Sequence, residues 1–176
     1  MMTNPKMLKQ FSIAKVVKTF LLYLGVFLLI YMGVNYLRKP VIPTHATLQF
    51  RGIDGQSLDL ATLSKKQAVL VYFWGTWCGV CRQTTPSVQS LNSVTYPVVS
   101  IAVQSGDNAK LANYATQHQL DFAVINDSEG ELFRAWQGQV TPSYVIVSHG
   151  KVVQSFTGIQ PAWVLKSRMA WVNVFG

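Results

Sequence analysis

An unbroken apolar run lies near the N-terminus of the chain. Residues 19–37 carry no formal charge and are rich in Leu, Val, Ile and Phe. As a helix this run would be about 29 Å long, close to the thickness of a bilayer's hydrocarbon core. No polar face interrupts it, which disfavours a buried core helix. The pattern therefore predicts one transmembrane helix over residues 19–37.

The flanks of this run favour an anchor over a cleaved signal peptide. A signal peptide has an apolar part of about 7–15 residues, followed closely by a small-x-small site. Here residues 38–40 are Arg-Lys-Pro, and the weak site at 44–46 lies far from the run. Four lysines precede the span and two basic residues follow it closely. The positive-inside rule then predicts a cytoplasmic segment 1–18, a linker 38–46 and export of the remainder.

Beyond the linker, apolar runs and turn residues alternate. The run at 68–74 is continuously apolar, as is typical of a strand buried on both faces, and the run at 98–103 is predicted to be a second buried strand. Strands are predicted at 47–50, 57–60, 68–74, 98–103, 122–125, 143–148 and 152–156, and helices at 79–94, 108–118, 131–136 and 161–171. Asp107 is a candidate N-cap of the second helix. This order predicts an α/β domain over 47–176, with a mixed, mainly parallel sheet flanked by helices.

The net charge of +8 suggests nucleic-acid binding until it is located. Residues 1–43 hold six basic residues and no acidic one, whereas residues 44–176 hold nine basic and seven acidic residues, a net of +2. The excess belongs to the flanks of the apolar run. No nucleic-acid partner is expected.

Candidate chemistry is concentrated in two cysteines, Cys78 and Cys81, at a predicted strand-to-helix junction. A structural disulfide would close a loop of four residues, worth roughly 2 kcal/mol, near the low end for such bridges. A closed zinc site needs four ligands, and the three histidines at 45, 118 and 149 have no ligand spacing. A c-type haem site would need His where Arg82 stands.

Redox chemistry fits the position of the pair better. A first cysteine at a helix N-terminus lies among unpaired backbone N–H groups and the positive end of the helix dipole, which stabilise a thiolate. Cys78 is then the attacking nucleophile. Cys81, one helical turn later, is expected to be the resolving thiol.

The residues around the pair resemble the thioredoxin superfamily. Residues 69–81, Val-Leu-Val-Tyr-Phe-Trp-Gly-Thr-Trp-Cys-Gly-Val-Cys, are similar to its central strand and active-site turn. The Phe-Trp-Gly-Thr-Trp-Cys portion resembles the membrane-tethered, extracytoplasmic TlpA/ResA branch. A single anchor with Cys-Gly-Val-Cys is also similar to the D protein of suppressor-of-copper-sensitivity systems. The resemblance implies a thioredoxin fold over about residues 47–172.

A second landmark, residues 140–147, resembles the cis-proline loop of the family. The resemblance implies that Pro142 is cis and that Thr141 lines the substrate site, while Gly158 matches a glycine near the active surface. Without the resemblance, Thr141-Pro142 is equally consistent with a turn that enters a strand. The implied substrate-binding residues are Trp77, Gly79, Val80, Thr141 and Pro142, with Trp77 as exposed apolar surface over the nucleophile.

Two positions depart from the family pattern. Thioredoxins carry a buried Asp where this chain has Tyr72, and ResA-like proteins carry a Glu where it has Thr84. Each carboxylate is thought to move protons to or from the buried thiol. Tyr72 is either core filling or a weak hydroxyl substitute, and no general base is assigned.

The resemblance therefore implies a membrane-tethered thiol-disulfide oxidoreductase in the inner membrane, with its catalytic domain in the periplasm and no cofactor beyond its own disulfide. Expected partners are cysteine-containing exported proteins and a membrane thiol electron donor, with a reductase direction. Copper(I) binding by the same pair is an alternative. A specialised reductase for apocytochrome c maturation is a narrower version of the same function.

Overall fold

The computed structural model describes residues 13–37 and 48–175, which belong to two separate units. The first is helix α1 (Ile13–Leu37), and its stretch Lys15–Val34, with mean hydropathy 2.0, is long and apolar enough to span a membrane. The helix begins six residues before the predicted span, since lysine is a good helix former. The predicted linker, most of the predicted cytoplasmic segment and Thr47 of the first predicted strand lie outside the described residues.

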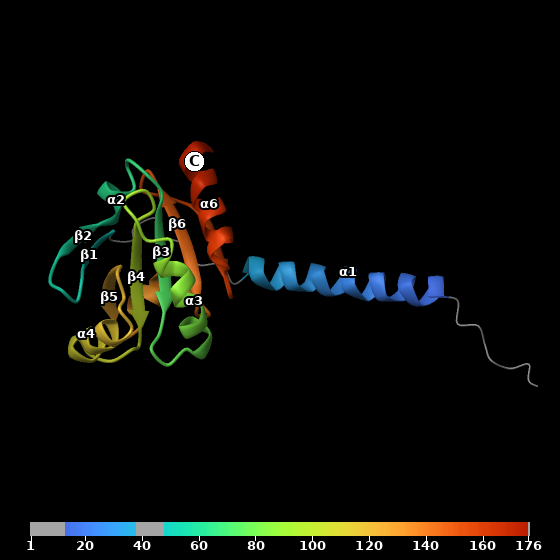
Figure 1. The fold of residues 1–176 in the computed structure, drawn as a ribbon, viewed down its shortest axis with the longest axis horizontal. Coiled ribbons are helices and arrows are strands. Elements are labelled where there is room, and N and C mark those ends of the chain that lie inside the picture. The colour runs from blue at the N-terminus through green and yellow to red at the C-terminus, as the bar shows by residue number, and fades with distance from the viewer. Residues whose placement is uncertain (1–12, 38–47, 176) are drawn as a thin grey trace, which may run out of the picture. The chain divides into compact units, whose positions relative to one another are not determined.

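The second unit is built on a five-stranded mixed sheet (Figure 1). Its strands are β3 (Val69–Trp74), β4 (Val98–Val103), β5 (Ala123–Asp127), β6 (Ser143–Ser148) and β7 (Lys151–Thr157), in the order β5-β4-β3-β6-β7. β3, β4 and β5 are parallel, whereas β6 pairs antiparallel with both β3 and β7. This is the predicted thioredoxin-like architecture, with β3 at its centre.

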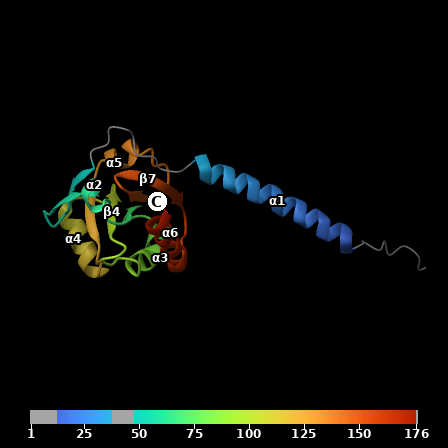
Figure 2. The same cartoon turned by 90° about the horizontal axis from the view of Figure 1, so that it is seen from above.

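The central strand is continuously apolar because both of its faces are covered. Leu70, Tyr72 and Trp74 point into one core, and the alternate residues of the strand point into the other. The first core is closed by α3 (Gly79–Gln89), α4 (Asn108–Gln117) and α6 (Ala162–Phe175). Helices α3 and α6 lie side by side on this face (Figures 1 and 2).

The opposite core is covered by short elements. The hairpin of β1 (Gln49–Arg51) and β2 (Ser57–Asp59) turns at Gly55, whose φ of +83° favours glycine. Two short helices, α2 (Leu60–Leu63) and α5 (Glu131–Ala135), complete this side, through Leu60 and Leu132 among other residues.

Helix α3 corrects the predicted helix over 79–94, because it ends at Gln89. The turn that follows is fixed from both sides by the Asn92 side chain. Its oxygen accepts a hydrogen bond from the Val98 backbone N–H at 3.1 Å, and its amide donates to the Asp121 carbonyl at 2.7 Å. These contacts hold the chain in a turn beyond Gln89, so the helix ends there.

Most other boundaries lie within one or two residues of those predicted. The exceptions are α6, which continues to Phe175, four residues past its predicted end, and α2, which was not predicted and whose first residue, Leu60, was expected to end a strand. Asp59 caps α2 by accepting from the Ala61 and Thr62 backbone N–H groups, and this ends β2 early. The predicted cap of α4 is confirmed, since the Asp107 carboxylate accepts from the Lys110 N–H at 2.8 Å.

Candidate active site

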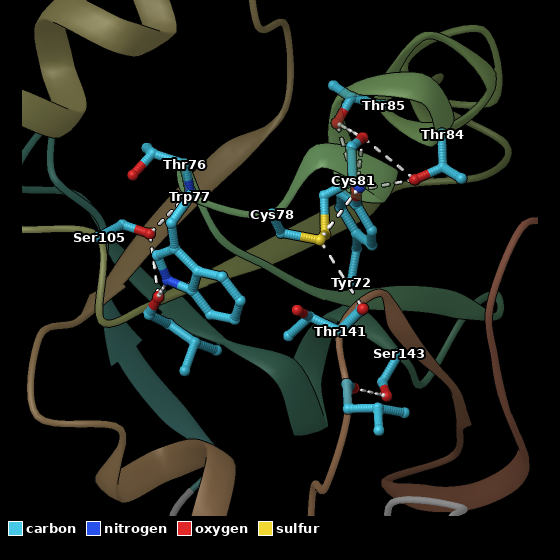
Figure 3. The surroundings of a disulfide bond; sticks show 12 residues. Tyr72, Thr76, Trp77, Cys78, Cys81, Thr84, Thr85, Ser105, Thr141 and Ser143 are labelled. Carbon is cyan, nitrogen blue, oxygen red and sulfur yellow. Dashed lines mark hydrogen bonds between the residues drawn. A yellow bond between two sulfur atoms is a disulfide. The ribbon is translucent and has the colours of Figure 1, made fainter.

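The two cysteines lie where β3 gives way to α3. Cys78 is the N-cap of the helix, with extended backbone, and Cys81 lies in its first turn. The two sulfurs form a disulfide (Figure 3). The Cys81 backbone N–H donates to the Cys78 sulfur at 3.1 Å. A sulfur in this position receives the unpaired N–H groups and positive dipole of the helix start, which is the environment that stabilises a thiolate.

The two sulfur-bearing residues differ in access to solvent. Cys78 is 6% exposed, whereas Cys81 is fully buried. The first turn of α3 contains no acidic residue that would oppose a negative charge on sulfur. An incoming disulfide therefore meets Cys78 first, and Cys81 lies behind it.

The loop before β6 approaches the pair from the other side. The Thr141–Pro142 peptide bond is cis, as the resemblance implied, and the Thr141 carbonyl oxygen lies 3.7 Å from the Cys78 sulfur. In the disulfide that sulfur carries no proton, so this approach is a packing contact, and only the reduced thiol can donate to the carbonyl. The Gly158 N–H donates to the Pro142 carbonyl at 3.0 Å, which ties the loop to the end of β7.

Apolar side chains surround the pair at the surface. Trp77 and Val80 are exposed, and Gly79 is exposed between the two cysteines. Sequence reasoning missed Ile159, which is exposed directly after Gly158 and so extends this surface on the side of the cis-proline loop. The one indication in the sequence was that Ile159 directly follows Gly158, the glycine that matches the family.

Trp77 is held in a defined orientation. Its indole nitrogen donates to the Val103 carbonyl at 3.0 Å, and Figure 3 shows the ring beside Cys78. A side chain on Gly75 would meet this ring at 2.7 Å, so the glycine makes room for it. Ser105 accepts from the Thr76 N–H at 3.0 Å and donates to the same Val103 carbonyl, which anchors the turn to the end of β4. No local pattern indicated Ser105.

The two departures from the family pattern meet beneath Cys81. The Tyr72 hydroxyl lies 3.2 Å from the hydroxyls of both Thr84 and Thr85 and 3.4 Å from the Cys81 carbonyl oxygen. Thr84 and Thr85 also donate to that carbonyl, at 3.1 and 2.8 Å. The three side chains form a hydroxyl cluster that joins β3 to α3. Thr85 was missed, although its spacing of four from Cys81 places it on the same helix face as Thr84.

The cluster is neutral at physiological pH. Burial raises the pKa of Tyr72 above its usual value, and the hydrogen bonds from Thr84 and Thr85 only partly offset this. Tyr144 stacks on Tyr72 with ring centroids 5.3 Å apart, and burial raises its pKa as well. The hydroxyls of Tyr72, Thr84 and Thr85 orient the backbone of Cys81, and neither tyrosine is a base near pH 7.

Within the described residues, no group of three or more His, Cys, Asp or Glu side chains is placed to hold a metal ion. Of the histidines weighed as ligands, His118 stacks on Tyr114 with ring centroids 3.9 Å apart, and His149 lies in the hairpin turn. His45 lies outside the described residues.

Comparison with known proteins gives the same family. Residues 42–167 match the Redoxin family model. A thioredoxin-like protein of Haemophilus influenzae is 36% identical, over 94% of this chain and 99% of its own length. The thiol-disulfide oxidoreductase ResA of Bacillus thuringiensis is 31% identical over 61% of this chain and 64% of its own length.

The fold has solved counterparts. The crystal structure of StoA from Bacillus subtilis superposes with a TM-score of 0.62, at 22% identity, over 73% of this chain and 98% of that one. At that identity the likeness concerns the fold. Together with the family match and the Cys-Gly-Val-Cys turn, it places the chain in the Redoxin family, in the ResA-like branch of the thioredoxin superfamily.

Proposed function

We propose that this thiol-disulfide oxidoreductase works outside the cytoplasm, tethered to the membrane by α1, and reduces disulfides in exported proteins. The observation that carries the proposal is the arrangement at the start of α3. There a slightly exposed Cys78 receives a helix N–H, lies against the Thr141 carbonyl and is backed by a buried Cys81.

Reduction of a substrate follows from this arrangement in two exchanges. The Cys78 thiolate attacks one sulfur of a substrate disulfide, and the other substrate sulfur leaves as a thiolate and takes up a proton. The Cys81 thiol then loses its proton and attacks the Cys78 sulfur, which releases the second substrate thiol. The substrate gains two electrons and two protons, and the Cys78–Cys81 disulfide forms.

The first exchange depends on how much Cys78 is ionised. Lowering a thiol pKa from about 8.5 to about 7 raises the thiolate fraction at pH 7 from roughly 3% to 50%, for about 2 kcal/mol. The helix start and the Cys81 N–H supply stabilisation of this kind. No charged side chain among the described residues hydrogen-bonds to the Cys78 sulfur. Modest thiolate stabilisation keeps the dithiol a good electron donor, which supports the reductase direction.

The exposed surface offers a path for an extended substrate. Thr141 presents its backbone carbonyl group next to Cys78, and Trp77, Val80 and Gly79 are exposed on the other side. The substrate class that suits this surface is a cysteine pair in a flexible or unfolded segment, whose backbone is open to hydrogen bonding.

The tether completes the proposal. The apolar stretch Lys15–Val34 has the length and composition of a span, and four lysines precede residue 19 against two basic residues that follow closely. This asymmetry favours a cytoplasmic N-terminus and a periplasmic domain. A membrane protein with a reactive dithiol is the expected donor that returns electrons to the pair.

The test of direction is the redox state of the pair in living cells. Thiols are trapped by acid quenching and alkylation, and the full-length protein is compared in cells with and without candidate membrane electron donors. The pair is expected to be mainly reduced and to become oxidised when the donor is lost. A pair that is oxidised in both strains would contradict the reductase direction.

Two alternatives use the same residues: copper(I) binding by the cysteine pair, and disulfide reduction in apocytochrome c maturation. Copper(I) accepts two thiolates at low coordination number. Stoichiometric copper uptake by the reduced chain, without any disulfide exchange, would replace the proposal. An apocytochrome c substrate would keep the proposed chemistry and specify its target.

A further inference from the structure

Helix α6 exposes large apolar side chains that its packing on the sheet does not use. Its inner face buries Leu165, Met169 and Val172. On its outer face four apolar residues are each more than 60% exposed, and we call them the aromatic stripe: Trp163, Trp171, Val174 and Phe175. A surface helix ordinarily carries polar residues there. An apolar patch of this kind marks a contact surface.

The four residues share one side of the helix. At 100° per residue, Trp163, Trp171, Val174 and Phe175 fall within an arc of about 120°. The rings of Trp171 and Phe175 pack with centroids 4.5 Å apart. Exposed Lys166 borders the arc. Tryptophan and phenylalanine on one side of a helix, with lysine beside them, is the arrangement of helices that lie in the interface of a bilayer.

The charge of this side of the domain complements an anionic surface. All seven acidic residues lie between Asp54 and Glu131, so β6, β7 and α6 contain none. Helices α3 and α6, which lie side by side, carry Arg82, Lys166 and Arg168 and no acidic residue. The strand order places β5, which ends in Asp127, at the opposite edge of the sheet from β7.

The length of the chain keeps the domain near a bilayer. Ten residues, 38–47, separate α1 from the described part of the domain, and ten residues span at most about 36 Å however they are arranged. That reach is roughly the diameter of a domain of this size. A contact between the domain and the headgroups is therefore effectively intramolecular, so a small patch is enough to hold it.

We propose that the aromatic stripe of α6 inserts into the headgroup region of the bilayer that holds α1, on an anionic phospholipid surface. The indole rings of Trp163 and Trp171 suit the boundary between headgroups and acyl chains. Lys166 lies level with the lipid phosphates. This inference rests on the proposed membrane anchoring, and it adds a second contact that orients the domain.

Tryptophan fluorescence tests the contact, because all five tryptophans lie at residue 74 or later and none lies in α1. The full-length chain is reconstituted in phosphatidylethanolamine–phosphatidylglycerol vesicles, with or without lipids brominated close to the headgroup. The brominated lipid is expected to quench at most the part of the tryptophan emission that comes from Trp163 and Trp171. Trp163→Phe/Trp171→Phe should lose this quenching, whereas the matched variant Trp77→Phe should keep it.

Flotation separates this inference from the anchoring on which it rests. A chain that fails to float with vesicles would contradict the anchoring itself. A chain that floats but shows equal emission in brominated and plain vesicles would overturn the contact between the aromatic stripe and lipid. Cross-linking of position 171 to a protein partner, in the absence of quenching, would overturn it as well. Quenching should be weaker in phosphatidylcholine vesicles, and equal quenching there would overturn the assignment to anionic lipid.

Discussion

Tyr72 and Thr84 are two replacements that look independent in the sequence and meet in one hydrogen-bonded cluster. Each stands where relatives are expected to keep a carboxylate, and together with Thr85 they converge on the Cys81 carbonyl. A lone buried carboxylate would need its own partners, whereas these hydroxyls satisfy one another. The pair of changes is therefore physically coupled, and the protons of the exchange reaction have to travel by another route, such as water.

The first prediction concerns the hydroxyl of Tyr72. Tyr72→Phe removes a hydroxyl that contacts three oxygens and keeps the stacked ring, so the oxidised protein should lose about 1 kcal/mol of unfolding free energy. Disulfide exchange should continue, because Thr85 still donates to the Cys81 carbonyl. Denaturant unfolding measures the change. Tyr96→Phe, at a half-buried tyrosine outside the cluster, is the control, and an equal effect of the two changes would contradict a specific role for the cluster.

The same tyrosine sets an alkaline pH dependence. Burial raises the folded pKa of Tyr72 above the ordinary tyrosine value of 10.0, so folding favours the neutral form. That stabilisation is complete below pH 10 and is lost as the pH rises through the folded pKa. Wild type should therefore lose stability above pH 10 more steeply than Tyr72→Phe. Parallel curves of unfolding free energy against pH for the two proteins would contradict this prediction, because they would show that the hydroxyl titrates alike in the folded and unfolded states.

At the scale of elements, the sequence pattern predicted those helices and strands whose ends are set by the residues of the element and its flanking turns. The strands at 98–103 and 143–148 were predicted residue for residue, because mainly apolar runs rich in Val and Ile specify a buried strand. The end of α3 could not be predicted, since Asn92 fixes it through contacts with residues of two other segments. The cysteine turn and the cis peptide were predicted by resemblance, whereas the hydroxyl cluster depends on tertiary contact.

Helix α2 offers a test at this scale. The Thr62 hydroxyl donates to the Asp59 carboxylate at 2.7 Å, and this bond is the main cause of the lowered pKa of Asp59. Asp59→Ala removes the cap, so it should destabilise the β2–α2 region at pH 7, whereas Asp59→Asn keeps an acceptor and should do so less.

The pH dependence of that effect follows from the direction of the shift. The Thr62 hydrogen bond lowers the folded pKa of Asp59 below the ordinary aspartate value of 3.8, so the charged cap stabilises the fold above that pH and loses its effect as the pH falls. The difference in stability of the β2–α2 region between wild type and Asp59→Asn should disappear in acid. Hydrogen exchange of the Ala61 and Thr62 amides measures it, and a gap that stays constant from pH 7 to pH 3 would contradict a role for the charge.

The whole molecule joins an apolar helix to a redox domain whose charges are unevenly distributed. Its acidic residues are confined to 54–131, and the neighbouring helices α3 and α6 carry only basic charge. Composition alone could not reveal this, because residues 44–176 have a net charge of only +2. The sheet order determines which charges share a side, and it makes one side of the domain suited to a membrane surface.

The central claim, that Cys78 attacks and Cys81 resolves, is tested most directly by trapping the mixed disulfide in cells. Cys81→Ser in the full-length chain removes the resolving thiol, so covalent adducts with exported proteins should accumulate on non-reducing gels and disappear on reduction. Cys78→Ser, which leaves only the fully buried Cys81, is the matched control and should form few adducts. Adducts that depend on Cys78 are the predicted result. An absence of adducts from Cys81→Ser, or equal adducts from both variants, would contradict the account.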